Sequence, residues 1–140
     1  MNRKEFLKSS LLLGGLGLAG SAILIESCSK SSNSTTAAQG PTVNFTLDLS
    51  QAANAALKTV GGSLASNSVV VICTAANTYT ALAQACTHQG CPLSYSNNQM
   101  VCPCHGGTFD MNGNVVAGPP PAPIKKYTVS KSGNILTVVG

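Results

Sequence analysis

From residue 41 onward, the hydrophobic positions follow the two-residue period of β-strands, and helical periodicity is nearly absent after residue 60. Apolar and polar residues alternate throughout residues 42–49, which predicts a strand with one buried face. Residues 69–74 form a continuous apolar run, and residues 79–83 follow as its hairpin partner. Cys73 lies inside this apolar run, so we expect it to be a buried, small hydrophobic residue.

Three further hairpins follow from turn residues between short apolar segments. Asn97-Asn98 marks one turn, and Asn112-Gly113 is suited to a type I′ turn. Pro119, Pro120, Pro121 and Pro123 remove four backbone donors, so residues 118–123 should form a stiff loop that joins no ladder. The hairpin arms are expected at residues 93–95 and 99–101, at residues 108–110 and 114–116, and at residues 124–130 and 135–139.

Residues 50–57 fit two local structures. Ser50 could cap a short alanine-rich helical turn, or the segment could run extended towards the Gly61-Gly62 turn. The sequence alone leaves both open.

The N-terminal 40 residues have a different composition from the rest. Residues 1–28 have the pattern of an export signal, with a basic start and an uncharged run at residues 9–25. That run is marginal for a membrane span, which needs roughly 20 residues. Residues 29–40 are polar and small, which is typical of a flexible linker, so a single domain is expected over residues 41–140.

Two likenesses refine the export signal. Residues 3–8 resemble a twin-arginine signal in which Lys4 replaces the second arginine. Residues 25–29 resemble a bacterial lipobox, in which Cys28 would be lipidated and become the first mature residue. The alternatives are an uncleaved helical anchor and a cytoplasmic protein with a hydrophobic start.

Composition supports an all-β domain. Only 9% of the 140 residues are charged, and Trp is absent, whereas Val, Thr, Gly and Pro are abundant. The net charge of +4 comes without a basic cluster that contains aromatic residues, so nucleic-acid binding has little support.

Both histidines and four of the six cysteines lie in two short boxes, at residues 86–91 and 102–107. Each box pairs one thiolate with one imidazole: Cys86 with His88, and Cys102 with His105. A Cys2His2 set suits zinc or an iron-sulfur centre, and ligand count does not choose between them. Zinc sites of this composition usually pair cysteine with cysteine and histidine with histidine, which favours the iron-sulfur centre.

The boxes resemble the Rieske family, whose pattern joins Cys-x-His to Cys-x-x-His. Phe109-Asp110, Gly113, Val115 and Gly118-Pro119 occur in the family's order. The resemblance implies an antiparallel β-sandwich or barrel with a small cluster-binding subdomain of two loops, at about residues 85–110. It also implies one [2Fe-2S] cluster, with the following ligands: Cys86 and Cys102 on the buried iron, and His88 and His105 on the outer iron.

The same resemblance assigns roles to the neighbouring residues. Cys91 and Cys104 match the pair that forms a disulfide in the cytochrome bc type, consistent with an oxidising compartment. Gly90, Gly106 and Gly107 would let the backbone approach the cluster and donate N–H groups to its sulfurs, or would serve tight turns only. Gly107 and Phe109 stand where high-potential relatives carry hydroxyl donors, and Gln89 stands where quinol-oxidising relatives carry leucine.

These features predict an exported, membrane-tethered one-electron carrier, in the periplasm or on the cell surface. Its expected partner is a cytochrome c or a periplasmic oxidoreductase. One alternative is the Rieske subunit of a quinol-oxidising cytochrome bc-type complex, with a cytochrome b as partner, and a minor alternative is a structural zinc module. An oxygenase is disfavoured, because its iron triad needs two histidines and both are already assigned.

Overall fold

The computed structural model of the chain describes residues 38–140. The predictions of an export signal at residues 1–28 and of a lipidated Cys28 therefore lie outside the described residues, as does most of the expected linker. Within the described part, no helix is both long and apolar enough to span a membrane.

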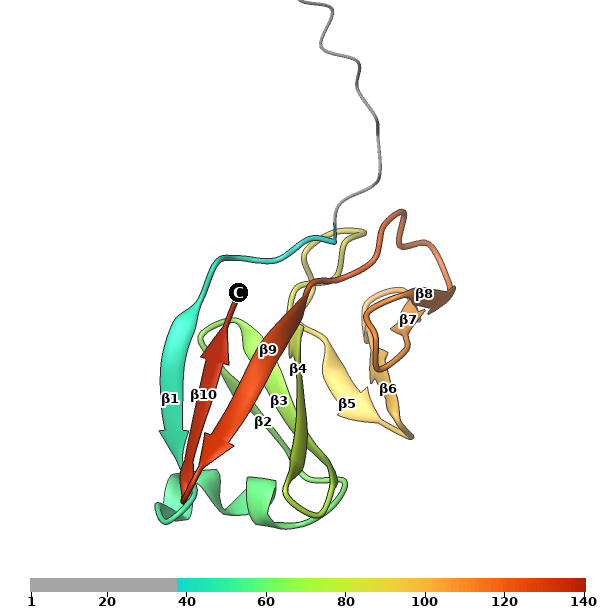
Figure 1. Cartoon of the computed structure of the whole chain (residues 1–140). Helices are drawn as coiled ribbons and strands as arrows, with labels where there is room; N and C mark the ends of the chain where they lie inside the picture. Colours follow the sequence, from blue (N-terminus) through green and yellow to red (C-terminus); the bar gives the residue numbers. More distant parts are fainter. Residues whose placement is uncertain (1–37) are drawn as a thin grey trace, which may run out of the picture. The chain divides into compact units, whose positions relative to one another are not determined.

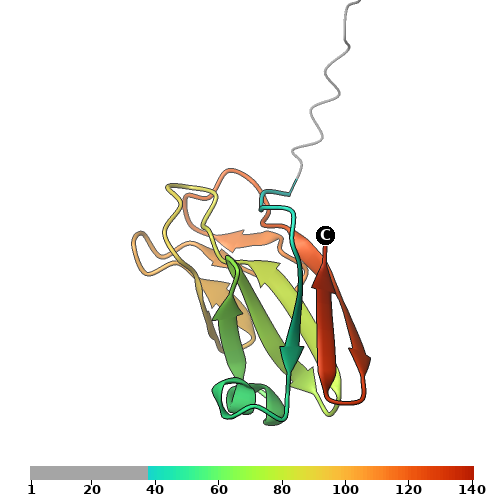
Figure 2. The same cartoon turned by 90° about the vertical axis from the view of Figure 1, so that its left-hand side faces the viewer.

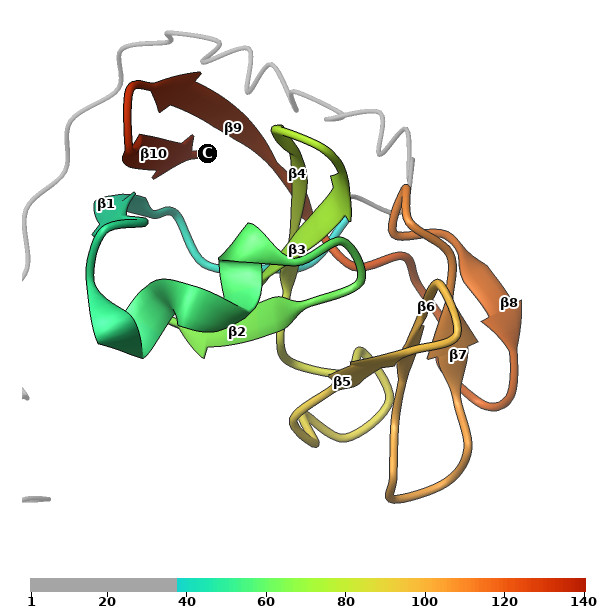
Figure 3. The same ribbon diagram turned by 90° about the horizontal axis from the view of Figure 1, so that it is seen from below.

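Six antiparallel strands form the larger sheet (Figure 1). Seen from below, the sheet curls, and the helix η1 (Ala52–Lys58) lies beside the edge strands β1 and β2 (Figure 3). The strand order is β1 (Asn44–Asp48), β10 (Ile135–Val139), β9 (Lys126–Ser132), β4 (Thr78–Ala83), β3 (Val69–Ala75) and β2 (Ser63–Ser66).

Hydrophobic alternation places one face of this sheet in the core. Leu47 of β1 pairs with Leu136 of β10, and both side chains are buried. All five residues from Val69 to Cys73 are buried, as their continuous apolar run predicts. The prediction of an all-β, antiparallel fold is confirmed.

A second sheet of four short antiparallel strands carries the boxes. Met100 of β6 pairs with Phe109 of β7, and both side chains are fully buried. They tie this sheet to the common hydrophobic core, because both belong to the same cluster of buried residues as Leu82 and Leu136. The order is β5 (Ser94–Ser96), β6 (Gln99–Val101), β7 (Thr108–Phe109) and β8 (Val115–Ala117).

The turn type that the sequence predicts is found in one hairpin and not in another. Asn97 and Asn98 both have positive φ, at 49° and 60°, as a type I′ turn between β5 and β6 requires. The type I′ prediction for Asn112-Gly113 is wrong, because only Gly113 has a positive φ. The Asp110 carboxylate sets this turn instead: it accepts hydrogen bonds from the backbone N–H groups of Asn112 and Asn114.

Residues 50–57 adopt the helical alternative, as the 3-10 helix η1. The expected cap is wrong, because Ser50 hydrogen-bonds back to the Asp48 carboxylate and Gln51 occupies the cap position. Strand β2 was not predicted, since Leu64 is its only large apolar residue. Figure 2 shows η1 at the end of the six-stranded sheet that lies away from the boxes.

Residues 118–123 form no strand, in agreement with their prolines. The chain segment before β1 joins the fold where this loop ends. The N–H of Gln39 donates to the Pro123 carbonyl, the Lys125 N–H donates to the Gln39 carbonyl, and the Tyr127 hydroxyl donates to the Pro41 carbonyl. Gln39 and Pro41 therefore fix the start of the described chain against the domain.

Candidate metal centre

The two boxes form loops with the same backbone frame. In the first, the Cys86 N–H donates to the Cys91 carbonyl, and the Gly90 N–H donates to the Cys86 carbonyl. In the second, Cys102 donates to Gly107 and Gly106 donates to Cys102 in the same pattern. Gly90 and Gly106 have φ values of 74° and 72°, a conformation that favours glycine. Both loops therefore turn back on themselves within six residues.

This frame directs backbone N–H groups at the first cysteine of each loop. The Cys86 sulfur accepts from the N–H groups of His88 and Gln89, and the Cys102 sulfur accepts from those of Cys104 and His105. Such hydrogen bonds stabilise a thiolate, which is the metal-binding form of cysteine. Sequence reasoning missed these donors, because the relevant signal is the loop conformation rather than a residue type.

The two thiols differ in acidity. Burial raises the pKa of Cys86, and the two N–H groups offset this only in part. Burial acts in the same direction on Cys102, but its N–H donors and the Cys86 thiol together bring the pKa of Cys102 below its ordinary value. The pKa values of the two thiols are thus displaced in opposite directions.

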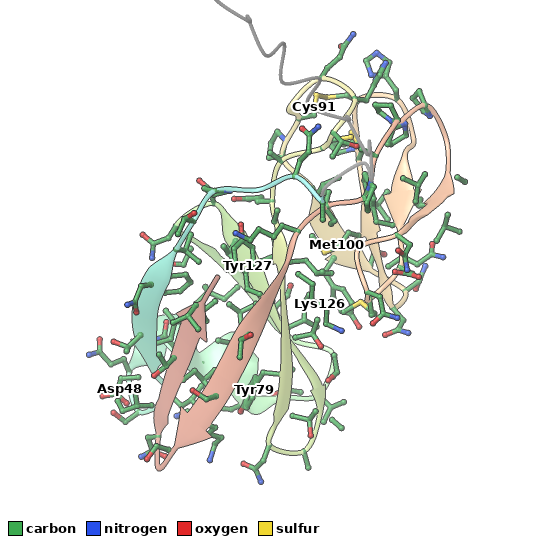
Figure 4. All side chains as sticks on the ribbon, turned by 45° about the horizontal axis from the view of Figure 1, so that its top comes forward. Asp48, Tyr79, Cys91, Met100, Lys126 and Tyr127 are labelled. Atoms are coloured by element: carbon green, nitrogen blue, oxygen red, sulfur yellow. A yellow bond between two sulfur atoms is a disulfide. The ribbon has the colours of Figure 1, made fainter. Side chains whose placement is uncertain are left out.

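A disulfide joins the two loops. Cys91 and Cys104 are bonded, with a Cα–Cα distance of 6.5 Å, as the resemblance implied. The sulfur atoms of Cys91, Cys102 and Cys104 all lie within 4.8 Å of one another, but only that of Cys102 is free. The disulfide therefore braces the two loops, and the free thiols within the boxes are those of Cys86 and Cys102. Figure 4 shows Cys91 at the loop end of the molecule, opposite Asp48 and Tyr79.

The two histidines come together from separate loops. Their ring centroids are 4.9 Å apart, with an angle of 83° between the ring planes. His105 is exposed and His88 is half-buried, whereas Cys86 and Cys102 are 3% and 2% exposed. The site is thus asymmetric, with its thiols inside and its imidazoles at the surface.

One atom shows that this donor set fits a metal cluster. Nδ1 of His88 is buried and has no hydrogen-bond partner within the described part of the chain. An unsatisfied buried polar atom costs about 1–3 kcal/mol, and a metal bond would remove that cost. Two free buried thiols in the same pair of loops complete a set of soft and imidazole donors suited to iron and sulfide.

Residues 118–123, which we call the proline loop, contact both boxes. The Thr87 hydroxyl donates to the Ala122 carbonyl at 2.6 Å, which ties it to the first box. A Cβ atom on Gly107 would lie 2.6 Å from Cγ of Pro120, so the second box is in direct contact with it. The lack of a side chain at Gly107 is therefore what allows this contact.

The remaining predicted residues have distinct positions. The N–H groups of Gly90 and Gly106 donate to the carbonyls of Cys86 and Cys102, within the turns of the two loops. Gln89 is exposed, and Phe109 is fully buried with no hydroxyl group to offer the site. Of the proline-loop residues, Gly118, Pro119 and Pro121 are exposed and Pro120 is buried.

Comparison with known proteins agrees with this geometry. A family model described as the Rieske [2Fe-2S] domain matches residues 43–128. The chain belongs to the Rieske family. Its [2Fe-2S] cofactor follows from that membership, and the alternative of a structural zinc module loses its support.

The curated relatives match part of this chain and part of their own length. The chain is 32% identical over 71 residues to the cytochrome b6-f complex iron-sulfur subunit of Chlorobaculum thiosulfatiphilum, covering 49% of this chain and 39% of that subunit. It is 40% identical over 62 residues to the carotenoid phi-ring synthase of Chlorobaculum tepidum, covering 43% of this chain and 10% of that protein. The chain thus spans less than half the length of these curated relatives.

Among solved structures, the chain resembles the plasma membrane Rieske protein from the cyanobacterium Synechocystis PCC 6803. The TM-score is 0.52 and the sequence identity is 32%, over 61% of this chain and 93% of that one. A solved Rieske structure therefore shares nearly its full length with this domain.

Proposed function

We propose that this Rieske domain is a one-electron carrier whose cluster is bound by Cys86, Cys102, His88 and His105. The observation that carries the ligand assignment is the buried, unpartnered Nδ1 of His88, beside two free thiols and a second imidazole. When bound, a Rieske cluster supplies a single-electron couple. The buried Cys86 and Cys102 would hold the cluster from inside the domain, and His88 and His105 would hold it on the side that a redox partner can approach.

The exposed histidine side gives the electron its route to a partner. His105 lies at the surface, so electron exchange requires a partner to approach the tips of the two loops. The disulfide between Cys91 and Cys104 joins the loops and supports function in an oxidising compartment. Together with the export pattern at residues 1–28, it supports a membrane-tethered carrier that serves a cytochrome c or a periplasmic oxidoreductase.

Iron and sulfide analysis of the purified full chain tests the cofactor and its ligands. We expect two irons and two labile sulfides per chain, a red-brown colour and the reduced EPR signal of a Rieske centre. His88→Ala should lose that signal. Zinc in place of iron, or a Rieske signal that survives this substitution, would contradict the ligand assignment.

The reduction potential is a second test. Gly107 and Phe109 provide no hydroxyl donor, so we expect a value well below the upper end of the Rieske range of about −150 to +300 mV. A redox titration that returns a value near the upper end contradicts this expectation.

Membrane attachment is tested at Cys28. In a bacterial host, lipidation predicts that the wild-type protein fractionates with membranes as a shortened chain that begins at a lipid-bearing Cys28, and that Cys28→Ser carries no lipid. A wild-type protein that stays in the membrane at full length and without lipid would indicate an uncleaved anchor instead.

One set of relatives favours a second function. The subunits of cytochrome b6-f complexes among the relatives support the Rieske subunit of a quinol-oxidising complex. Reduction by a quinol only in the presence of a cytochrome b partner would establish this alternative, whereas reduction without such a partner would exclude it.

A further inference from the structure

Among the described residues, charged side chains are absent from both boxes and from residues 118–123. Within residues 38–140 the charged side chains are four lysines and two aspartates, and none lies between Lys58 and Asp110. That interval contains both boxes. Residues 111–124, which include β8 and the proline loop, are also free of charge.

The charged side chains of the domain have neighbours outside the two boxes. Lys58 and Lys131 line a hollow with Tyr79, at the end of the molecule opposite Cys91 (Figure 4). Lys126 donates to the Asn112 side chain, and the Lys125 ammonium lies 5.3 Å from the centre of the Tyr127 ring. The Asp110 carboxylate accepts hydrogen bonds within its own turn.

Around the histidines the exposed surface is neutral and partly apolar. Gln89 and His105 are exposed on the loops, and Pro119 and Pro121 are exposed on the loop that packs against them. Edge strand β8 continues into the proline loop, and its Val116 is 52% exposed (Figure 1). We call Gln89, His105, Val116, Pro119 and Pro121 the neutral face.

We propose that the neutral face docks a redox protein whose own docking surface is uncharged, so that recognition uses no ion pairs. The proposal rests on the proposed function, because electron exchange through the histidines brings the partner to this face. A charged residue of a partner would lose its hydration here and find no opposite charge, which selects against charged partner surfaces. Association at this face is therefore not electrostatically steered.

The neutral face is continuous, because the proline loop adjoins both boxes. A Cβ atom on Gly118 would lie 2.7 Å from Cα of Gly107, so the proline loop directly adjoins the second box. The Thr87 hydroxyl holds the same loop to the first box. A protein that contacts His105 therefore meets the prolines on the same approach.

The test measures oxidation of the reduced, cluster-loaded full chain by copper(II) azurin, a blue copper protein with an apolar surface around its copper. One electron passes to each copper(II), which becomes copper(I). Between about 10 mM and about 500 mM ionic strength, we expect the second-order rate constant to change by less than about twofold, because the docking face itself presents no charge to be screened.

Exposed valines provide a matched set of variants. Val116→Glu puts a charge on the neutral face and should slow the reaction about tenfold, because the carboxylate loses water without gaining a partner. Val116→Thr keeps the shape without a charge and should slow the reaction much less than Val116→Glu does. Val60, which is 58% exposed and lines the hollow at the far end, provides the control Val60→Glu, which should also leave the rate unchanged.

A second readout does not depend on electron transfer. In an NMR titration with zinc-substituted azurin, which is redox-inactive, residues of β8 and the proline loop should shift, and those around Val60 should not. Equal slowing by Val116→Glu and Val60→Glu, or a strong salt dependence of the wild type, would overturn the docking face. A chain that lacks iron and sulfide would instead overturn the proposed function, so the two failures are distinguishable.

Discussion

The two cluster loops have the same backbone frame but different support. Each begins with a buried cysteine, turns at a left-handed glycine and directs two N–H groups at the cysteine sulfur. The first loop contacts the proline loop through a side-chain hydrogen bond from Thr87. The second has the backbone of Gly107 packed directly against Pro120. A shared frame thus positions the thiolates, while different neighbours hold each loop in place.

The two loops also differ in the spacing between cysteine and histidine. His88 lies two residues after its cysteine and His105 lies three residues after its own. In a shared frame, this offset brings the rings together at 83° to each other rather than in equivalent orientations. The backbone frame therefore sets the positions of the two cysteines, and the one-residue difference in spacing sets the positions of the imidazoles.

The largest expected effect comes from removing either frame cysteine. If the loops contribute equally, Cys86→Ser and Cys102→Ser should each reduce bound iron at least about tenfold, because each removes a ligand. Cys73 is also a free, buried thiol but lies on β3, so Cys73→Ser is the matched control and should retain the cluster. Iron analysis of the three variants decides the matter, and full loading of either frame variant would refute the ligand set.

Removing the link between the loops should have the next largest effect. The disulfide closes 13 residues of chain, and its loss in Cys91→Ser/Cys104→Ser should lower the free energy of unfolding by about 3 kcal/mol. Denaturation of the oxidised wild type and of the double variant measures the difference. No change in stability would mean that the proline loop alone holds the two loops together.

Glycine substitutions separate the two kinds of support. Gly107→Ala forces a Cβ atom against Pro120 and should cost about 1–3 kcal/mol in unfolding free energy, by overpacking. Gly90→Ala meets no atom within 4 Å, so only its positive φ is penalised, at about 1–2 kcal/mol.

The diagnostic measurement for these glycines is a second substitution in the same background. Replacing Pro120 with Ala should recover stability in Gly107→Ala and not in Gly90→Ala, because only the first variant clashes with that ring. Equal behaviour of the two variants would contradict the difference in support.

The smallest effect is expected at the side-chain tie of the first loop. Thr87→Val removes the hydrogen bond to the Ala122 carbonyl and should cost about 1 kcal/mol. Thr128 is exposed on β9, and Thr128→Val is the control, with a change near zero. Thermal unfolding of both variants provides the comparison. If the two are equally stable, Thr87 contributes nothing to holding the first loop.

Local pattern predicts the strands well where a hydrophobic face is pronounced. Residues 42–49 and 69–74 became β1 and β3 because their apolar side chains have only one way to enter the core. Strand β2 has one large apolar residue and is held by pairing with β3, a tertiary effect that its own sequence does not show. The turn at residues 110–114 was misjudged because the Asp110 carboxylate, rather than Asn112, determines it.

The site was predictable in composition and not in conformation. The spacing of cysteines and histidines pointed to an iron-sulfur centre, and the resemblance supplied the disulfide. The N–H donors of His88 and Cys104 depend on φ and ψ angles that residue type does not specify. The contact between Gly107 and Pro120 joins residues 13 positions apart in the chain and follows from the path of the hairpin between them.

The pairing of Gln39 with the segment after the proline loop has a mechanical consequence. Tension applied at Gln39 acts first on its hydrogen bonds to Pro123 and Lys125, before it reaches the first strand. Gln39 and Ile124 run parallel, so the pull loads their two hydrogen bonds together, and the Tyr127 hydroxyl holds Pro41 behind them. Strand β1 is therefore loaded only after these contacts. The segment that is loaded first is residues 123–125, which directly follow the proline loop.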